Sequence, residues 1–191
     1  MEKPRPVTHL SDPRALRAYA HPVRMALVGL LRTEGPLTAT KAAELLGESS
    51  GTCSFHLRQL AKYGLVEEAG GGTGREKPWQ ATTMTTSWSS VTRDPEMAAA
   101  TSMLNTIVAE RYFEQLATWL ERGQTESQQW QEAALFGDFF LYVTAEELTE
   151  IGRRVQGLLE DYRERQTQPE LRPDGARRVT FLKLAFPTEY A

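Results

Sequence analysis

The sequence predicts a mainly α-helical fold with small β elements, made of a compact N-terminal domain, one long helix and a small α+β C-terminal segment. Three observations lead to this prediction. Over the first sixty residues, apolar side chains repeat at helical spacing between helix-capping signals. A glycine-rich run then separates two short segments typical of a β-hairpin. Residues 94–123 lack an internal breaker and predict a helix about 40 Å long.

Composition narrows the class of protein. A chain of 191 residues can bury one substantial core or two small ones. Its single cysteine, Cys53, cannot form a disulfide within the chain, and the first residues, MEKPRPVTHLSDPR, lack the apolar stretch of a secretory signal. No run of 18 apolar residues predicts a membrane span. We therefore expect a cytoplasmic protein without a membrane segment.

Charge divides the chain unevenly. The net charge is −3, but residues 1–90 hold 11 Lys and Arg against 8 Asp and Glu, whereas residues 91–191 hold 11 against 17. The first half is therefore at +3 and the second at −6. The first half is the one suited to phosphate, although so modest a difference also arises by chance.

Four short helices are predicted in the first half. Asp12 and Pro13 start a helix that ends near His21, and Pro22 starts a second that ends at Gly35. Thr38 caps a third, which ends about two turns later at Gly47, and Ser49 caps a fourth that runs to Tyr63 and Gly64. Their inward residues are Leu16, Tyr19, Val23, Ala26, Leu27, Leu30, Leu31, Ala39, Ala42, Ala43, Leu46, Cys53, Leu57 and Leu60.

The third and fourth helices form a helix-turn-helix pattern. A tight turn at Gly47 and Glu48 separates them, and small Ala42 and Ala43 let the helices approach closely. The backbone amides near Ser49 offer a phosphate site. The outward face of the fourth helix carries hydroxyl, amide and cationic groups suited to base edges and phosphates: Ser50, Thr52, Phe55, Arg58, Gln59 and Lys62.

A hairpin and a polar connection follow. Leu65 and Val66 precede the Gly-rich run 70–74, and the segment 75–81 returns. The run is not a phosphate loop, because no Gly-Lys-Ser/Thr follows it. Eight of the eleven residues 82–92 are Ser or Thr, which favours an extended connection and a domain boundary.

The stretch TATKAAELLGESSGTCSFHLRQLAKYGLVEE, followed by the Gly-rich turn and REKPWQAT, resembles the winged helix of the ArsR-type repressor family. The resemblance covers Asp12 to Thr83 and is sharpest over SFHLRQLAKYGLV. It implies a winged helix-turn-helix transcriptional regulator, in most cases a repressor, that binds pseudo-palindromic double-stranded DNA as a homodimer. The DNA-binding residues expected from the pattern and the resemblance are Ser49, Ser50, Thr52, Phe55, His56, Arg58, Gln59 and Lys62 in the recognition helix, with Arg75 and Lys77 in the wing.

Some of these residues have ordinary structural interpretations as well. His56 follows Cys53 by three positions and would then be half buried, and Arg58 and Lys62 would be solvated surface charges. Many family members have a basic or polar residue where this chain has Phe55. Its role stays open between contact with a thymine methyl group and part of a surface patch. Trp79 is expected to pack the wing against the core.

Metal sensing and catalysis are not expected. A thiolate metal site needs two or three cysteines, and this chain has one. The three histidines lie in the first half, so the long helix has no His-x-x-His pattern. No nucleophile is paired with a base in the sequence, and we expect neither an enzyme nor a cofactor.

The long helix is expected to form the dimer. Its apolar residues repeat at close to 3.5 positions, as in helices that pack along a partner: Met97, Ala100, Leu104, Ile107, Val108, Tyr112, Leu116, Trp119 and Leu120. Two recognition helices would then lie roughly 34 Å apart on DNA. The alternative is packing of this helix against the C-terminal segment of the same chain.

The C-terminal segment is expected to be strand, helix, strand. Residues 139–143 and 179–186 have strand composition, and Thr144 with Glu147 forms a capping box for the helix between them. The expected parts are a tail (1–11), the DNA-binding domain (12–83), a connection (84–93), the long helix (94–123) and this segment (124–191). Its aromatic residues would line a site for an organic effector or form plain core: Trp130, Phe136, Phe139, Phe140, Tyr142 and Tyr162.

The sequence thus predicts a dimeric, sequence-specific DNA-binding regulator that a small molecule or partner protein controls through the C-terminal segment. The alternative is a winged helix that serves only as a protein-interaction module and binds no DNA.

Overall fold

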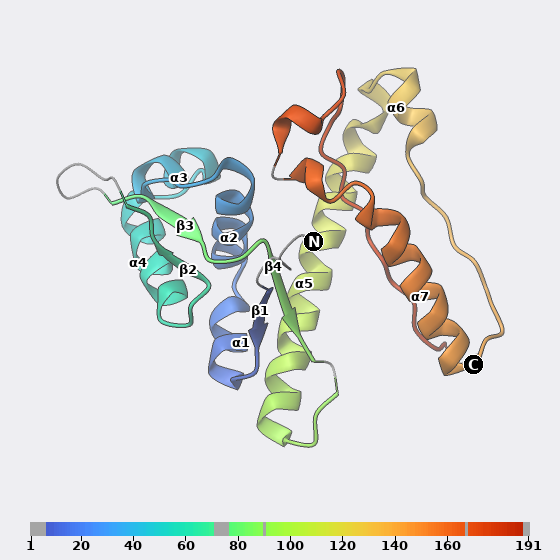
Figure 1. The fold of residues 1–191 in the computed structure, drawn as a ribbon, viewed down its shortest axis with the longest axis horizontal. Helices are drawn as coiled ribbons and strands as arrows, with labels where there is room; N and C mark the ends of the chain where they lie inside the picture. The colour runs from blue at the N-terminus through green and yellow to red at the C-terminus, as the bar shows by residue number, and fades with distance from the viewer. Residues whose placement is uncertain (1–6, 71–76, 90, 167, 189–191) are drawn as a thin grey trace. The chain divides into compact units, whose positions relative to one another are not determined.

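The computed structural model describes residues 7–70, 77–89, 91–166 and 168–188 (Figure 1). The chain divides into two compact units, Met1–Thr118 and Trp119–Ala191. The division falls inside the long helix, α5, which spans Pro95–Arg122.

The helices of the first unit begin and end where local signals place them. The side chains of Asp12, Thr38 and Ser49 each accept a backbone N–H at a helix start, and Gly47 ends its helix with a φ of 69°. This left-handed conformation is one that glycine adopts without strain. The predicted capping pattern is therefore confirmed for these helices: α1 Pro13–Tyr19, α2 Pro22–Glu34, α3 Ala39–Leu46 and α4 Ser50–Ala61.

The predicted hairpin is confirmed. Strands β2, Val66–Glu68, and β3, Trp79–Ala81, pair antiparallel and form the wing. The Trp79 backbone also exchanges two hydrogen bonds with Leu37, which lies just before α3, at 2.8 and 2.9 Å. Residues 71–76 of the wing tip lie outside the described residues, so nothing is said of Arg75.

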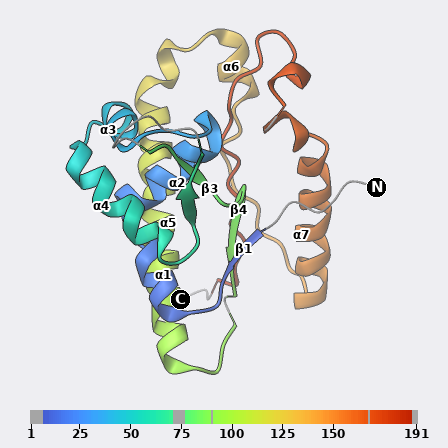
Figure 2. The same ribbon diagram turned by 60° about the vertical axis from the view of Figure 1, so that its left-hand side comes forward.

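A second sheet corrects two predicted boundaries. The expected tail contains strand β1, Val7–Leu10, and the expected connection contains strand β4, Thr85–Trp88; the two pair in parallel (Figures 1 and 2). β-branched Thr and Val suit a strand, and the partner lies far away in the sequence, where no local pattern reveals it. Both segments therefore belong to the folded domain.

The core of the first unit collects one face of each helix. It includes the predicted inward residues Leu16, Leu27, Cys53, Leu57 and Leu60, and Trp79 packs against it as expected. Two residues of α5, Ala100 and Leu104, are buried in the same core. The N-terminal half of the long helix is therefore part of this domain.

The regular elements of the second unit are helices, and most of its described residues are exposed. The capping box of Thr144 and Glu147 is confirmed, but residues 139–143 and 179–186 are not strands. Both segments have strand composition, yet neither has a hydrogen-bonded partner strand among the described residues. A strand needs such a partner. The helical elements are η1 Gly123–Thr125, α6 Gln128–Ala133, α7 Ala145–Glu160, η2 Glu164–Gln166 and η3 Pro169–Leu171.

A bidentate ion pair joins two segments of the second unit that are distant in the sequence. The Arg177 guanidinium donates to both carboxylate oxygens of Glu126 at 2.8 and 2.9 Å. It also lies 4.9 Å from the centre of the Trp130 ring.

Across the described ranges, no helix is both long and apolar enough to cross a membrane.

Candidate nucleic-acid interface

Helix α4 presents a continuous exposed ridge. Four residues at positions i, i+4, i+7 and i+11 are exposed, namely Gly51, Phe55, Arg58 and Lys62. Cys53, Leu57 and Leu60 on the opposite face are fully buried. The predicted inward face is confirmed. Of the predicted outward residues, Ser50, Phe55, Arg58 and Lys62 are exposed, whereas Thr52 and Gln59 are half-buried. In Figure 2 the helix lies at the rim of its domain.

Close packing against α3 holds this ridge in place. Ala42 is fully buried and Ala43 almost so, while Leu45 on the other side of α3 is 51% exposed. Larger side chains at the two alanines would push α4 away from α3. The small residues that mark the helix-turn-helix pattern are therefore at the contact that sets the position of α4.

The N-terminus of α4 is held by a hydroxyl pair. The Ser49 Oγ accepts the Thr52 backbone N–H at 3.0 Å and lies 2.8 Å from the Thr52 Oγ1. Ser50, the first helical residue, is exposed. Both serines are exposed, and Ser49 differs from Ser50 in that its hydroxyl is engaged in capping.

The cations of the ridge are held by neutral neighbours. Arg58 donates to the Ser54 Oγ at 2.9 Å, and Lys62 donates to the Gln59 Oε1 at 3.4 Å. Within the described ranges, neither cation is in a salt bridge, so both charges remain available to phosphate. On the wing, Lys77 instead forms a 2.6 Å salt bridge with Glu68.

The structure corrects the expectation for His56. Its side chain is 8% exposed, and its ring lies 4.5 Å, centre to centre, from the ring of His21. Burial lowers the pKa of both imidazoles, and nearby Arg24 lowers each further. His56 follows Cys53 by three residues, and this spacing brings it to the buried side of α4. His56 therefore packs inside the domain and is not part of the exposed face of α4.

One residue that fixes the domain was not predicted. The Arg32 side chain of α2 donates to the Thr83 carbonyl oxygen at 2.9 Å and to the Thr86 Oγ1 at 2.7 Å. It thereby ties α2 to the segment that enters β4. Burial lowers the pKa of this guanidinium. Arginine within a helix is usually a surface residue, so sequence periodicity gave no signal for this contact.

Helix α5 also departs from the expected dimer surface. Ala100 and Leu104 are buried in the domain core, with Met97, Ile107 and Val108 packed against it. These five residues pack within their own chain, as the alternative to a dimer held. Their partner, however, is the core of the first unit and not the C-terminal segment. The large apolar residues of α5 that stay exposed are Met103, Tyr112, Phe113 and Leu120, of which Met103 and Phe113 were not predicted.

The predicted aromatic pocket of the second unit is not formed. Phe139 is 91% exposed, and Phe136, Phe140, Tyr142 and Tyr162 are each more than half exposed. Side chains this exposed do not line an enclosed site. Trp130 is half-buried under the Arg177 guanidinium.

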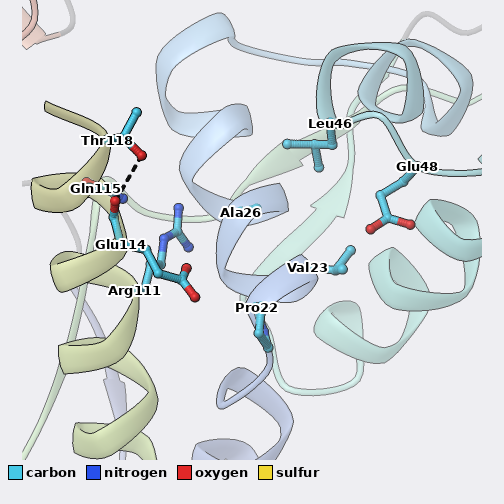
Figure 3. A pocket seen from close by; sticks show the side chains of 9 residues that line it. All are labelled: Pro22, Val23, Ala26, Leu46, Glu48, Arg111, Glu114, Gln115 and Thr118. Carbon is cyan, nitrogen blue, oxygen red and sulfur yellow. Dashed lines mark hydrogen bonds between the residues drawn. The ribbon is translucent and has the colours of Figure 1, made fainter. Parts of the chain in front are cut away.

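A shallow groove lies between α2 and α5 instead (Figure 3). Its volume is about 390 Å³. Val23 and Ala26 of α2 and Leu46 of α3 give it an apolar side, and Glu48 stands in the turn before α4. Arg111, together with other side chains of α5, lines the opposite side.

The described residues contain no cluster of three or more His, Cys, Asp or Glu side chains that could hold a metal ion. Cys53 is fully buried, and burial raises the pKa of its thiol. The thiol is thus a packing group.

Comparison with protein families finds a match for part of the chain. Residues 19–69 match the family model of a helix-turn-helix domain. Together with the β2–β3 wing, they make this part of the chain a winged helix-turn-helix domain, as the sequence predicted. No curated protein matches the chain.

Two solved structures are among those that match the chain. One is the winged helix-turn-helix DNA-binding domain of Mycobacterium bovis Mb0332, described as a possible ArsR-family transcriptional regulator, with 21% identity over 51% of this chain and 77% of that chain. The other is a mutant of Lactococcus lactis ZitR in apo form, with 18% identity over 76% of this chain and 86% of that one. Both TM-scores are 0.33, too low to support any argument.

Proposed function

We propose that the protein is a DNA-binding transcriptional regulator that places α4 in the major groove of double-stranded DNA. The observation that carries this proposal is the exposed ridge of α4, where Arg58 and Lys62 have no acidic partner among the described residues. An α-helix fits the major groove, and cations beside it neutralise phosphates. The resemblance to ArsR-type winged helices over residues 12–83 supports the same function, and it favours repression over activation.

The proposal assigns different tasks along α4. Ser50, Thr52, Phe55 and Gln59 would meet base edges, and Arg58 and Lys62 would meet the phosphate backbone. Lys77 and Arg75 on the wing are expected near the backbone or the minor groove. Ser49 would act through its cap, which orients the backbone amides at the start of α4.

We further propose that the protein binds DNA as a homodimer through α5. The apolar residues Phe113, Leu116 and Leu120 follow one another by three and four positions, the spacing of a helix that packs along a second helix. Phe113 and Leu120 are exposed, and Leu116 between them is half-buried. Phe113 and Leu120 are each more than half exposed, so a partner helix would remove them from water. This surface replaces the one predicted around Ala100 and Leu104, which the domain itself buries.

Control by a small organic molecule is a separate hypothesis. The groove of Figure 3 is a better candidate site than the exposed aromatic residues, because it joins the turn at Glu48 to Arg111 of α5. Its occupant would bias the angle between the recognition helix and the dimer helix. A screen of metabolites by thermal shift tests this, and loss of the shift in Ala26→Trp would locate the site.

The deciding experiment is DNA selection with the purified full chain, followed by titrations of the selected duplex at several salt concentrations. Regulator binding predicts that log K falls linearly with log salt, with a slope set by the phosphate contacts. Arg58→Ala should weaken binding to all sequences and make the slope shallower by about one contact. Arg14→Ala removes an exposed charge from α1 and is the matched control.

The rival hypothesis is a winged helix that binds only other proteins. It predicts no enriched sequence in the selection and no effect of Arg58→Ala on residual DNA binding. Such an outcome would refute the regulator proposal. We also propose that the protein acts in the cytoplasm, as the sequence predicted.

A further inference from the structure

Phe55 stands out on the surface of α4. Its side chain is 51% exposed at the middle of a ridge whose other members are Gly51, Arg58 and Lys62. The half-buried residues beside it, Ser54 and Gln59, are polar as well. Phe55 is therefore an isolated large apolar group on a polar helix face, and no apolar patch continues from it along α4.

The ring of Phe55 is braced from below. The Phe55 and His56 rings lie 5.3 Å apart, centre to centre, in an edge-to-face arrangement with an interplanar angle of 68°. His56 in turn packs on His21, the residue before α2, at 4.5 Å. Edge-to-face contacts of this kind stabilise aromatic pairs. The buried imidazoles thus contact the exposed ring on the side that faces the domain.

The chemistry of the major groove limits what such a ring can recognise. Base edges there offer hydrogen-bond donors and acceptors, which an aromatic ring does not pair with. The apolar feature of the groove is the C5-methyl group of thymine. An exposed ring at the centre of a recognition helix matches that methyl group.

We propose that Phe55 is a specificity-determining residue that packs against the C5-methyl group of a thymine in the DNA site. The inference rests on the proposed function, because it requires α4 to enter the major groove. It assigns to His56 a positioning role: the buried imidazole sets the direction of the ring that reads the base. The DNA site of this protein accordingly contains a thymine opposite the middle of α4 in each half-site.

Replacement of thymine by deoxyuridine tests the proposal, since it deletes the methyl group and leaves every hydrogen-bonding atom. Each thymine of the selected duplex is replaced singly, and the affinity of the full chain is measured. We expect about a fourfold loss at the contacted position, the effect of one buried methyl-sized group. At the other positions we expect affinity close to that of the parent duplex.

Protein variants complete the test. Phe55→Ala should bind the parent duplex more weakly and lose its sensitivity to deoxyuridine at that position, because the two changes remove the same contact. Leu45→Ala is the matched control: Leu45 is equally exposed, at 51%, but lies on α3. It should keep both the affinity and the deoxyuridine effect. Thermal unfolding of each variant checks that the domain remains folded, and Phe55→Gln serves as a second truncation of the ring.

The outcomes separate the two proposals. Failure to select any DNA sequence overturns the regulator function and this inference with it. A selected sequence whose affinity is unchanged by every deoxyuridine replacement overturns the methyl contact alone. The same conclusion follows if Phe55→Ala and Phe55→Gln retain the full deoxyuridine effect, because another residue would then contact the methyl group.

Discussion

The imidazole rings of His21 and His56 pack against each other at 4.5 Å inside the first domain, and the Nδ1 atom of each is buried without a hydrogen-bond partner. One ring precedes α2 and the other lies in α4. The packing of the recognition helix therefore involves two imidazoles whose protonation depends on pH.

Acidification should destabilise this domain. Burial lowers the pKa of both histidines below 6.5, and Arg24 adds to the effect, whereas Glu48 opposes it. As the pH falls below about 6.5, the unfolded chain binds protons that the folded domain does not, so the free energy of unfolding decreases. Thermal unfolding between pH 8 and pH 5 should show a falling midpoint.

The variant His56→Phe separates this effect from general acid sensitivity. It keeps a ring beneath Phe55 but removes one titrating group, so the midpoint should depend less on pH. His9→Gln is a control, since His9 is a histidine outside this pair, on β1, with its Nδ1 3.1 Å from the Ser87 Oγ. A pH dependence in His56→Phe equal to that of the parent chain would contradict the prediction.

Replacement of Arg32 should loosen the link between α2 and β4. Arg32→Met keeps the aliphatic length but removes the donors to Thr83 and Thr86. Each hydrogen bond from a charged donor contributes about 2 kcal/mol, so the loss of these two should lower the free energy of unfolding by about 2 to 4 kcal/mol. Urea denaturation measures it. Arg14→Met, an exposed change on α1, should have an effect below about 0.5 kcal/mol.

Two adjacent serines offer a matched test of the cap of α4. Ser49→Ala removes the oxygen that accepts the Thr52 N–H and should cost about 1 kcal/mol of stability. Ser50→Ala changes the next residue, which makes no cap, and should leave stability nearly unchanged. Equal losses from the two changes, measured by thermal unfolding, would show that the cap does not stabilise the domain.

The proposed dimer surface can be tested by one charge. Phe113→Glu places a carboxylate on the exposed stripe of α5 and should shift the protein from dimer to monomer in analytical ultracentrifugation. Glu110→Gln, one turn away, is the control. Because Phe113 is 56% exposed in the single chain, the folded domain should tolerate the change. A wild-type chain that sediments as a monomer at micromolar concentration would refute the dimer.

The parts of the fold that the sequence predicts are those determined by local chemistry. Caps at Asp12, Thr38 and Ser49 and the stop at Gly47 act within a few residues, so their positions can be identified directly. The exposed and buried faces of α4 follow from helical periodicity alone. His56 shows the limit of that periodicity, because a polar residue at the edge of the buried face can point either way.

Non-local pairing could not be predicted. The strand Val7–Leu10 is too short and polar to stand out, and its partner lies in a Ser/Thr-rich stretch. The apolar repeat of α5 correctly marks a packed helix, but it does not say whether Leu104 meets its own domain or a second chain. Composition likewise identified the apolar segment at Phe139 without revealing that no strand among the described residues pairs with it.

The parallel pairing of β1 with β4 also constrains how the domain is made. His9 and Ser87, which meet in this sheet, are 78 residues apart. Contacts this distant close late, since a long loop must be ordered first. On the ribosome, the residues of α1 to α4 are synthesised before those of β4. Any packing of the recognition helix during synthesis therefore takes place before the β1–β4 sheet can form.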